Sequence, residues 1–371
     1  MRNYRWGILG TGSIACEFTK GLKSVPGAVL HSAHSRTYEK ALLFADLFGF
    51  RTVHKELETF LNDPDVDIIY IATPNNLHSD HAIRCLEAGK HVLVEKPLAL
   101  NVGQGQEIVR SAKRNRRFCM EAMWSRFMPV YREVRSLLKQ RTIGKIEHVS
   151  AEFGEAMMYS PESRLFSLES GGGSLLDLGV YPISLALMLF GEPESITGVC
   201  RKAQSGVDTL DRISLYYKDG MVADLRSSFD CRLSNSIWIG GTEGSIEVPE
   251  PIYRPDKYRL KKYSPAKPAS APAYGIRDKL HQIPLFSRIL SGLKHYLKEP
   301  VTRRRQTHRV KVGGNGYQHE AREVMRAVDN GETESEIMPL HDSLAVLKIT
   351  DQLRREWGIR FPEIDTKMEY L

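Results

Sequence analysis

The chain has 371 residues, of which 42% are hydrophobic and 26% charged, a composition typical of an ordinary globular protein long enough for two domains. The formal net charge of +7 suits an anionic ligand, but Lys and Arg are spread along the chain, which argues against a nucleic-acid partner. The longest apolar run, at 180–190, is broken by Pro182 and Ser184 and falls short of the roughly 18 residues that span a bilayer, so no membrane partner is expected.

The cysteines and the N-terminus indicate a reducing compartment. The five cysteines are odd in number and form no CxxC pair, which argues against a disulfide framework and against a zinc site. The first ten residues, MRNYRWGILG, reach glycines before an apolar signal-peptide core can form. We therefore expect a cytoplasmic protein.

Strands and helices alternate through the first third of the chain. Strands are expected at residues 5–9, 28–35, 66–73 and 91–95, and helices from the 10–15 segment to about 25, at 38–48, at 76–88 and at 102–115. The run at 66–73 is rich in β-branched residues and is bounded by Pro64 and Pro74, which is typical of a strand buried on both faces of a parallel sheet. This pattern predicts a doubly wound, Rossmann-type α/β domain over residues 1–123.

The pattern changes after residue 123. Helices are expected at 129–139, 316–329 and 341–357, a strand at 146–153, a glycine turn and helix at 171–191, and a hairpin of 213–217 with 221–229. This predicts an α+β domain with a largely antiparallel sheet over residues 124–371. The Pro/Ala-rich segment 264–275 and the basic cluster Arg303 to Arg305 are expected to be loops.

The segment GTGSIA at residues 10–15 matches the dinucleotide-binding pattern GxGxxA in its required place, after a strand and at the start of a helix. Gly10 permits the tight turn, Gly12 lets the backbone approach a pyrophosphate at the positive end of the helix, and Ala15 allows close helix–strand packing. The expected cofactor contacts in this loop are Gly10, Thr11, Gly12, Ser13 and Ile14.

The end of the second strand distinguishes NADP from NAD. An acidic residue there would bind the ribose 2′-hydroxyl of NAD, but the sequence has Ser35 and Arg36. Arg36 can pair with a 2′-phosphate and stack on adenine, whereas Glu39 comes one helical turn later and faces elsewhere. We therefore expect NADP, although a solvated loop arginine is the simpler alternative for Arg36.

The segment ATPNNLHSDHA at 72–82 follows the strand expected at the centre of the sheet. Its amides can donate to a ribose or cap the next helix, and His78 can approach the cofactor, whereas His81 is expected on the helix surface. Two histidines three residues apart, without acids on another element, are weak support for a metal, and no metal is expected. The cofactor contacts expected here are Thr73, Pro74, Asn75, Asn76 and His78.

A strand at 91–95 ends in Glu95-Lys96-Pro97. Ligands of open parallel sheets bind beyond the carboxyl ends of the strands, so Lys96 is expected at the ligand site, unless the pair is simply a surface Glu–Lys. Pro97 favours an extended backbone at Lys96. The sequence does not distinguish a cis from a trans Lys96–Pro97 peptide bond. Glu95 either bonds ribose hydroxyls or holds Lys96 in place.

An ordered set of motifs resembles the Gfo/Idh/MocA oxidoreductase family over nearly the whole chain. The motifs are GTGSIA, IATPNNLH, EAGKHVLVEKP, EAMWSRF, GGGSLLDLGVYPI and the closing DSLAVLKITDQLRREWG. EAMWSRFMP and LLDLGVYPI are most similar to the branch of dimeric dihydrodiol dehydrogenases and NADP-dependent D-xylose dehydrogenases. The segment 255–312 departs most from the family pattern.

The resemblance implies a Rossmann domain followed by a domain with an open-faced sheet, often used for dimerisation, so a homodimer is expected. It implies that Lys96 and Tyr181 are the catalytic pair, assisted by Asp177, which is four residues from Tyr181 and shares its helix face if the helix begins early enough. Without the resemblance, Tyr181 would more readily be a core or interface tyrosine. Trp124 and Arg126 would line the nicotinamide side, with Glu95 nearby, and Phe153 would wall the substrate pocket.

The expected activity is hydride transfer between NADP and a secondary or hemiacetal alcohol of a sugar or a trans-dihydrodiol. Because free tyrosine has a pKa near ~10, Lys96 is expected to lower the pKa of Tyr181 so that the phenolate can take the substrate proton. The alternatives are another sugar such as 1,5-anhydro-fructose or inositol, glycoside cleavage with bound NAD, and a non-catalytic NADP-binding regulator.

Overall fold

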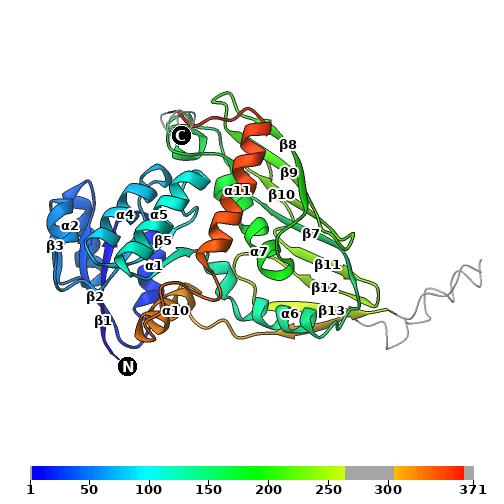
Figure 1. Cartoon of the computed structure of the whole chain (residues 1–371), viewed down its shortest axis with the longest axis horizontal. Coiled ribbons are helices and arrows are strands. Elements are labelled where there is room, and N and C mark those ends of the chain that lie inside the picture. The colour runs from blue at the N-terminus through cyan, green and yellow to red at the C-terminus, as the bar shows by residue number, and fades with distance from the viewer. Residues whose placement is uncertain (1, 264–304, 363–371) are drawn as a thin grey trace, which may run out of the picture.

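The computed structural model describes residues 2–263 and 305–362, which form two sheets with helices packed on and between them (Figure 1). The Pro/Ala-rich segment 264–275, together with Arg303 and Arg304, lies outside the described residues. None of the helices within the described ranges has the length and apolar composition needed to cross a membrane.

The N-terminal sheet has six parallel strands in the order β3-β2-β1-β4-β5-β6, the order of a Rossmann fold. Its elements are β1 Tyr4–Leu9, α1 Ser13–Leu22, β2 Ala28–His34, α2 Tyr38–Phe48, β3 Thr52–His54, α3 Leu57–Leu61, β4 Ile68–Ile71, η1 Asn75–Leu77, α4 His78–Glu87, β5 His91–Glu95, α5 Val102–Asn115 and β6 Cys119–Ala122. The predicted fold class is confirmed. β3, α3 and β6 were not predicted, because segments of three to five residues are too short to show a periodic pattern.

Strand β4 shows why the sheet is buried on both faces. Ile68 and Tyr70 pack into one apolar cluster, and Ile69 and Ile71 pack into the other, as expected for side chains that alternate across a strand. All four side chains have no exposed surface. The sheet is therefore covered on both faces, which leaves the ends of its strands as the places where a ligand can reach it.

The C-terminal sheet has eight strands in the order β14-β13-β12-β11-β7-β10-β9-β8, and only the β7–β10 pair is parallel. The elements of this half are η2 Trp124–Phe127, α6 Pro129–Lys139, β7 Ile146–Gly154, η3 Arg164–Phe166, the π-helix η4 Leu175–Gly179, α7 Val180–Phe190, β8 Ser195–Lys202, β9 Asp208–Tyr216, β10 Val222–Ser228, β11 Ile237–Gly241, β12 Gly244–Val248, β13 Lys257–Lys262, β14 Gln306–Arg309, α10 Gln318–Asp329 and α11 Leu340–Glu356. The largely antiparallel sheet was predicted correctly.

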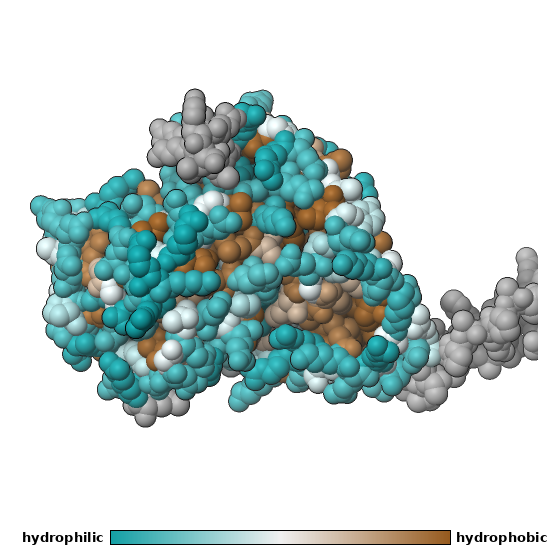
Figure 2. Space-filling view, viewed as in Figure 1, coloured by the Kyte–Doolittle hydropathy of each residue, from teal (hydrophilic) through white to brown (hydrophobic). Residues whose placement is uncertain are grey.

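The last two helices return to the N-terminal half, and α11 lies between the two sheets (Figure 1). The Tyr4 hydroxyl donates to Asp329 of α10 at 2.6 Å, and the Val102 amide donates to Asp351 of α11 at 2.8 Å. Figure 2 shows apolar side chains gathered between the N-terminal lobe and the C-terminal sheet. The two halves are therefore joined by both packing and hydrogen bonds.

The π-helix η4, which leads directly into α7, rests on two buried aspartates of β9. The Leu175 amide donates to Asp208 at 2.6 Å, and the Ser174 and Ser227 hydroxyls each donate to Asp211 at 2.6 Å. A π-helical turn is rare and is frequently found at functional sites. The two aspartates fix the point at which this turn begins.

Gly173 allows this arrangement. Its φ of 116° lies in the region that favours glycine, and a Cβ atom there would stand 2.3 Å from the Asp208 carboxylate. The glycine run before the helix is therefore needed for the close approach of the chain to Asp208.

The two carboxyl groups share a proton. Both side chains are fully buried, and burial raises the pKa of Asp208 and raises that of Asp211 much further, because a charged Asp208 stands next to it. Contact between the two carboxyl groups raises the pKa of Asp211 further and lowers that of Asp208. The pair thus behaves as one acid and one carboxylate at neutral pH.

We expect Asp211→Asn to leave the free energy of unfolding nearly unchanged at pH 4 and to raise it at pH 8. The pKa of Asp211 is higher in the folded chain than in the unfolded chain, so folding retains a proton that the unfolded chain releases above roughly pH 3.9. Wild-type stability therefore falls as the pH rises, whereas the amide can donate to Asp208 and accept from both serines at every pH. Urea unfolding of both proteins at the two pH values measures the difference.

The matched control is Asp211→Ala, which removes the acceptor of two buried hydroxyls. It should lower the free energy of unfolding by roughly 1–3 kcal/mol at pH 4 and by less at pH 8, because the alanine variant does not share the loss of stability that the wild type shows as the pH rises. If the free energy of unfolding of the wild type instead increasingly exceeds that of the asparagine variant as the pH rises, Asp211 is charged in the folded chain.

Candidate functional site

The glycine loop joins β1 to α1 and has the form that a pyrophosphate requires. Gly10 has a φ of 95°, and a Cβ atom there would stand 2.6 Å from the carbonyl oxygen of Ala72 on the neighbouring strand. Gly12 caps α1 without a side-chain hydrogen bond, and a Cβ atom there would have no neighbour within 4 Å. Free backbone amides thus face open space at the positive end of the helix, as dinucleotide binding needs.

The end of β2 lies beside this loop, because the Gly10 amide donates to the His34 carbonyl at 2.9 Å. Ser35 and Arg36 follow, and the Arg36 side chain is exposed without an ion pair to any residue in the described ranges. The structure therefore places Arg36, exposed, two residues after the strand end that contacts the glycine loop.

The segment after β4 brings two amides toward the same edge. Asn75 is buried and donates to the Gly171 carbonyl at 3.3 Å, which connects the Rossmann half to the glycine run of the second half. Asn76 has a buried side-chain oxygen without a hydrogen-bond partner among the described residues. Such an unsatisfied acceptor suits a ribose hydroxyl. Thr73 and Pro74 form the turn before these amides.

His78 does not face a cofactor. It is fully buried, its Nδ1 lies 2.8 Å from the Pro97 carbonyl oxygen, and its Nε2 lies 2.9 Å from the Thr73 carbonyl oxygen. Burial lowers the pKa of His78 to about 4, although the two backbone carbonyls act in the opposite direction. The expectation of a cofactor contact does not fit this placement, because both ring nitrogens already face the backbone of two strand ends.

Glu95 points into the protein from the last position of β5. Its carboxylate accepts from the Tyr70 hydroxyl and, at 3.2 Å, from the Lys96 amide. Burial raises its pKa to about 7. Of the two roles left open by the sequence, the structure favours holding the Lys96 backbone, since the buried carboxylate accepts from the Lys96 amide.

Lys96 and Asp177 form the central ion pair of the site. The Lys96 ammonium donates to the Asp177 carbonyl at 2.7 Å and to its carboxylate at 3.1 Å, and both side chains are mostly buried. Burial acts to lower the pKa of Lys96, but the negative groups around it, Asp177 first, outweigh burial and raise it. The peptide bond between Lys96 and Pro97 is cis.

Tyr181 stands over this pair, one turn after Asp177. The Lys96 nitrogen lies 5.3 Å from the centroid of its ring. The Tyr181 hydroxyl accepts from the Trp124 indole at 3.2 Å, and its ring contacts Phe153 edge to face at 5.3 Å. The structure thus brings Lys96, Asp177, Tyr181, Trp124 and Phe153 together, from segments far apart in the sequence.

The pKa of Tyr181 differs from the sequence-based expectation. Burial raises it to about 12, although Lys96 acts in the opposite direction, as expected. The phenol is therefore protonated at neutral pH in this structure, and the expected lowering of the pKa was wrong. Desolvation of a phenolate in a largely apolar, aromatic setting outweighs one nearby ammonium.

Arg126 is held by two helices of the second half. Its guanidinium is buried and donates to the Ser184 hydroxyl and carbonyl, both at 2.7 Å, and to Asp342 at 2.5 Å. Its donors therefore join η2 to α7 and to the start of α11. The expected nicotinamide contact stays a prediction, and these partners, which come from helices distant in sequence, give Arg126 a structural role as well.

Two residues of the site were missed. Arg164 of η3 approaches the Asp177 carboxylate to 3.7 Å with a half-exposed side chain, and Tyr317 stacks on Trp124 with ring centroids 4.1 Å apart. No motif marks either residue. Tyr70, whose hydroxyl donates to Glu95, could have been recognised from the sequence, because a tyrosine within a strand buried on both faces needs a polar partner.

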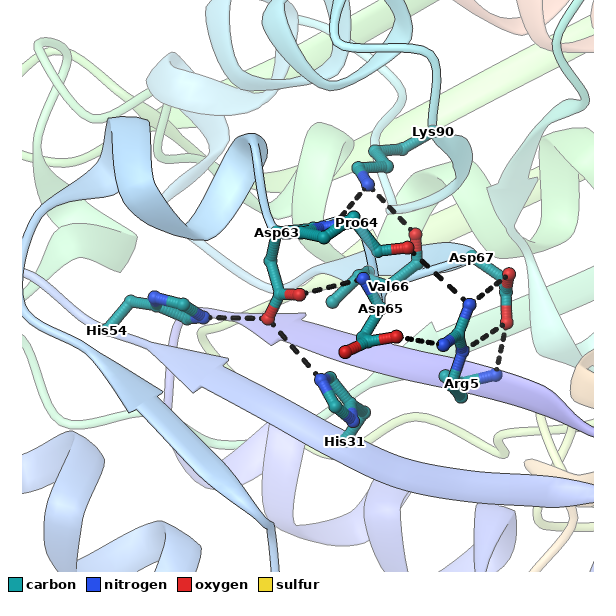
Figure 3. A network of polar contacts seen from close by, with 9 residues as sticks. All are labelled: Arg5, His31, His54, Asp63, Pro64, Asp65, Val66, Asp67 and Lys90. Carbon is teal, nitrogen blue, oxygen red and sulfur yellow. Dashed lines mark hydrogen bonds and ion pairs between the residues drawn. The ribbon is translucent and has the colours of Figure 1, made fainter.

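His31, Asp63 and Asp65 are the group within the described ranges whose ligand atoms are close enough to hold a metal ion. Figure 3 shows the Asp63 carboxylate between His54, at 2.8 Å, and His31, at 3.4 Å, while Asp65 pairs with Arg5. Arg5 stands at the amino end of β1, the opposite edge of the sheet from Lys96. These contacts connect strands and loops of the Rossmann half and do not belong to the catalytic group.

Comparisons with known proteins agree with this geometry. A family model described as an oxidoreductase family with an NAD-binding Rossmann fold matches residues 4–123, and one described as the GFO/IDH/MocA C-terminal domain matches residues 131–247. A trans-1,2-dihydrobenzene-1,2-diol dehydrogenase from Xenopus tropicalis is 34% identical over 363 residues, which cover 96% of this chain and 99% of the relative.

Two solved structures share the fold. A 3-ketoreductase from Actinomadura kijaniata, in complex with NADP and TDP-benzene, has a TM-score of 0.78 at 22% identity over 95% of this chain and 98% of its own. An aldose-aldose oxidoreductase from Caulobacter crescentus has a TM-score of 0.77 at 23% identity over 96% and 98%. With both family models matched in order and a full-length relative above 30% identity, the chain belongs to the Gfo/Idh/MocA oxidoreductase family.

Proposed function

We propose that this chain is an NADP-dependent oxidoreductase that transfers a hydride between the nicotinamide and a secondary or hemiacetal alcohol of a sugar or trans-dihydrodiol. The observation that carries the proposal is the Lys96–Asp177 pair beneath Tyr181, at the carboxyl end of β5 and on the same sheet edge as the glycine loop. The relatives named as dihydrodiol dehydrogenases support an aromatic diol, and a pentose such as D-xylose is the sugar to test beside it.

NADP, when bound, supplies the hydride chemistry. The residues that would hold it are the glycine loop for the pyrophosphate, Asn76 for a ribose hydroxyl and Arg36 for the 2′-phosphate. Arg36 supports NADP over NAD because its guanidinium is exposed beside the loop and has no ion-pair partner within the described ranges.

Tyr181 exchanges a proton with the substrate oxygen. Because its pKa is raised to about 12, the neutral phenol is ready to donate to a carbonyl oxygen when the substrate is reduced. In the oxidation direction the phenol must first lose its proton, which Lys96 favours by stabilising the phenolate. Asp177 takes two donors of the ammonium and so sets where the remaining N–H can point.

We also propose that the chain forms a homodimer through the face of the C-terminal sheet that no helix of residues 2–263 or 305–362 covers. Val199, Tyr216 and Trp238 stand on its strands with 63%, 39% and 37% of their surfaces exposed. Exposed apolar side chains on one sheet indicate a protein–protein interface. The five free cysteines support the cytoplasm as its location.

Tyr181→Phe and Lys96→Met should each lower kcat by roughly 10²–10⁴-fold, because each removes a group that handles the proton. Wild-type oxidation of the alcohol should also accelerate from pH 7 to pH 10, since the phenolate fraction rises toward a pKa of about 12. Tyr181→Phe should lose this dependence. NADPH absorbance with D-xylose and with an aromatic trans-dihydrodiol measures both effects.

The controls are Lys145→Met and Tyr263→Phe, which make the same chemical changes at partly exposed positions away from the site. Both should keep wild-type kcat. Near-wild-type turnover in either site variant would refute the assigned roles.

Arg36→Ala should raise KM for NADP by roughly 10–100-fold and leave KM for NAD nearly unchanged, because only NADP carries the 2′-phosphate. Arg110→Ala, at an exposed position on α5, is the control for the loss of one positive charge. Equal effects of Arg36→Ala on both cofactors would contradict the 2′-phosphate contact.

Sedimentation at micromolar concentration should give twice the chain mass of 42.0 kDa. Trp238→Glu should shift the equilibrium toward monomer, because it places a charge on the proposed interface, whereas Leu43→Glu, at a position 72% exposed on α2, should not. A wild-type protein that sediments only as monomer would rule out the dimer.

A further inference from the structure

A second cavity, of about 780 Å³, lies apart from the Lys96 site, where α10 meets the beginning of the chain and the start of α6 (Figure 1). Its volume is in the range of cavities that hold small ligands. The residues that line it are Arg2, Tyr4, Val25, Pro26, Phe127, Pro129, Arg132, His319, Arg322, Glu323, Met325, Arg326, Asp329, Asn330 and Ile337. Nothing in the proposed reaction uses these residues.

The floor of this cavity is apolar. Tyr4, Val25, Phe127 and Met325 contribute side chains that are less than a tenth exposed, and the two prolines and Ile337 extend this surface. An apolar floor of this kind favours an aromatic or aliphatic body, because such a body is removed from water when it binds.

The rim carries an excess of positive charge. Arg326 is neutralised by Glu323 at 2.8 Å and by Glu332 at 2.7 Å, and Asp329 accepts from the Tyr4 hydroxyl. The remaining three arginines, Arg2, Arg132 and Arg322, have no ion pair to any residue of 2–263 or 305–362. Arg2 lies over the Tyr4 ring at 5.4 Å, so one of these guanidinium groups is already positioned above the floor.

We propose that this cavity binds a small amphipathic anion. Its apolar body lies on the floor, and its carboxylate, sulfonate or phosphate group faces Arg2, Arg132 and Arg322. A guanidinium group matches such an anion with two parallel hydrogen bonds, and an arginine without a carboxylate partner is free to make them.

The cavity also touches the elements that support the catalytic group. Phe127 ends the short helix that begins with Trp124, and α10 follows directly after Tyr317, which stacks on Trp124. The lining comes from both halves of the chain, so a bound anion connects them and stabilises the folded protein in proportion to its occupancy.

Two fluorescent probes with the same ring system test the proposal. The probe 8-anilinonaphthalene-1-sulfonate carries a sulfonate, and N-phenyl-1-naphthylamine is its neutral counterpart. Titrations of the full-length protein are made with saturating NADP, which fills the nucleotide site. We expect the sulfonate to bind at one site per chain and at least tenfold more tightly than the neutral probe.

Charge reversal locates the site. The double variant R132E/R322E should weaken binding of the sulfonate at least tenfold and leave the neutral probe unaffected. R110E/R135E makes the same change in net charge at exposed arginines outside the cavity and should keep wild-type affinity. If the double variant fails to fold, R132Q and R322Q are measured singly, and each should weaken the sulfonate at least threefold.

Equal affinity of the protein for the sulfonate and for the neutral probe would overturn the proposal. An equal loss of sulfonate affinity in R132E/R322E and in R110E/R135E would also overturn it. Because NADP is bound throughout and the cavity variants leave the proposed catalytic group intact, these outcomes are independent of the proposed reaction.

Discussion

The ion pair of Lys96 and Asp177 holds the site together. Two donors of the ammonium go to one residue, at 2.7 Å and 3.1 Å, so the strand end of the Rossmann half is fixed to the π-helix of the second half. A buried ion pair gains little stability, because each charge loses its hydration, but removing one partner leaves the other charge uncompensated. The role of this ion pair is geometric, because it determines the position of Tyr181, one turn after Asp177, relative to Lys96.

Two sets of contacts determine the position of the π-helix and the environment of Tyr181, which follows it. Beneath it, Asp208 and Asp211 accept from its first residues, and Gly173 lets the chain come close enough for these bonds. Above it, the aromatic surroundings of Tyr181 exclude water and raise the pKa of the phenol to about 12. The same burial that positions the hydroxyl therefore also keeps its proton in place at neutral pH.

The sequence could predict those parts of the site that depend on local pattern. The glycine loop, the strand that ends at Lys96 and the turn of Gly173 each follow from spacing and backbone preference over a few residues. The contacts of Arg126 could not be predicted, because its partners are brought to it by helices far along the chain. Arg164 was missed for the same reason, since its proximity to Asp177 is a product of tertiary packing.

An acid and a base follow one another where β5 ends. Glu95, the last residue of the strand, turns inward to the Tyr70 hydroxyl, and Lys96, the first residue after it, turns toward Asp177. The buried carboxylate then accepts from the Lys96 amide and fixes the backbone from which the ammonium projects. Each of the two residues therefore has a role. Glu95 fixes the end of the strand, and Lys96, which follows it, contributes to the proposed chemistry.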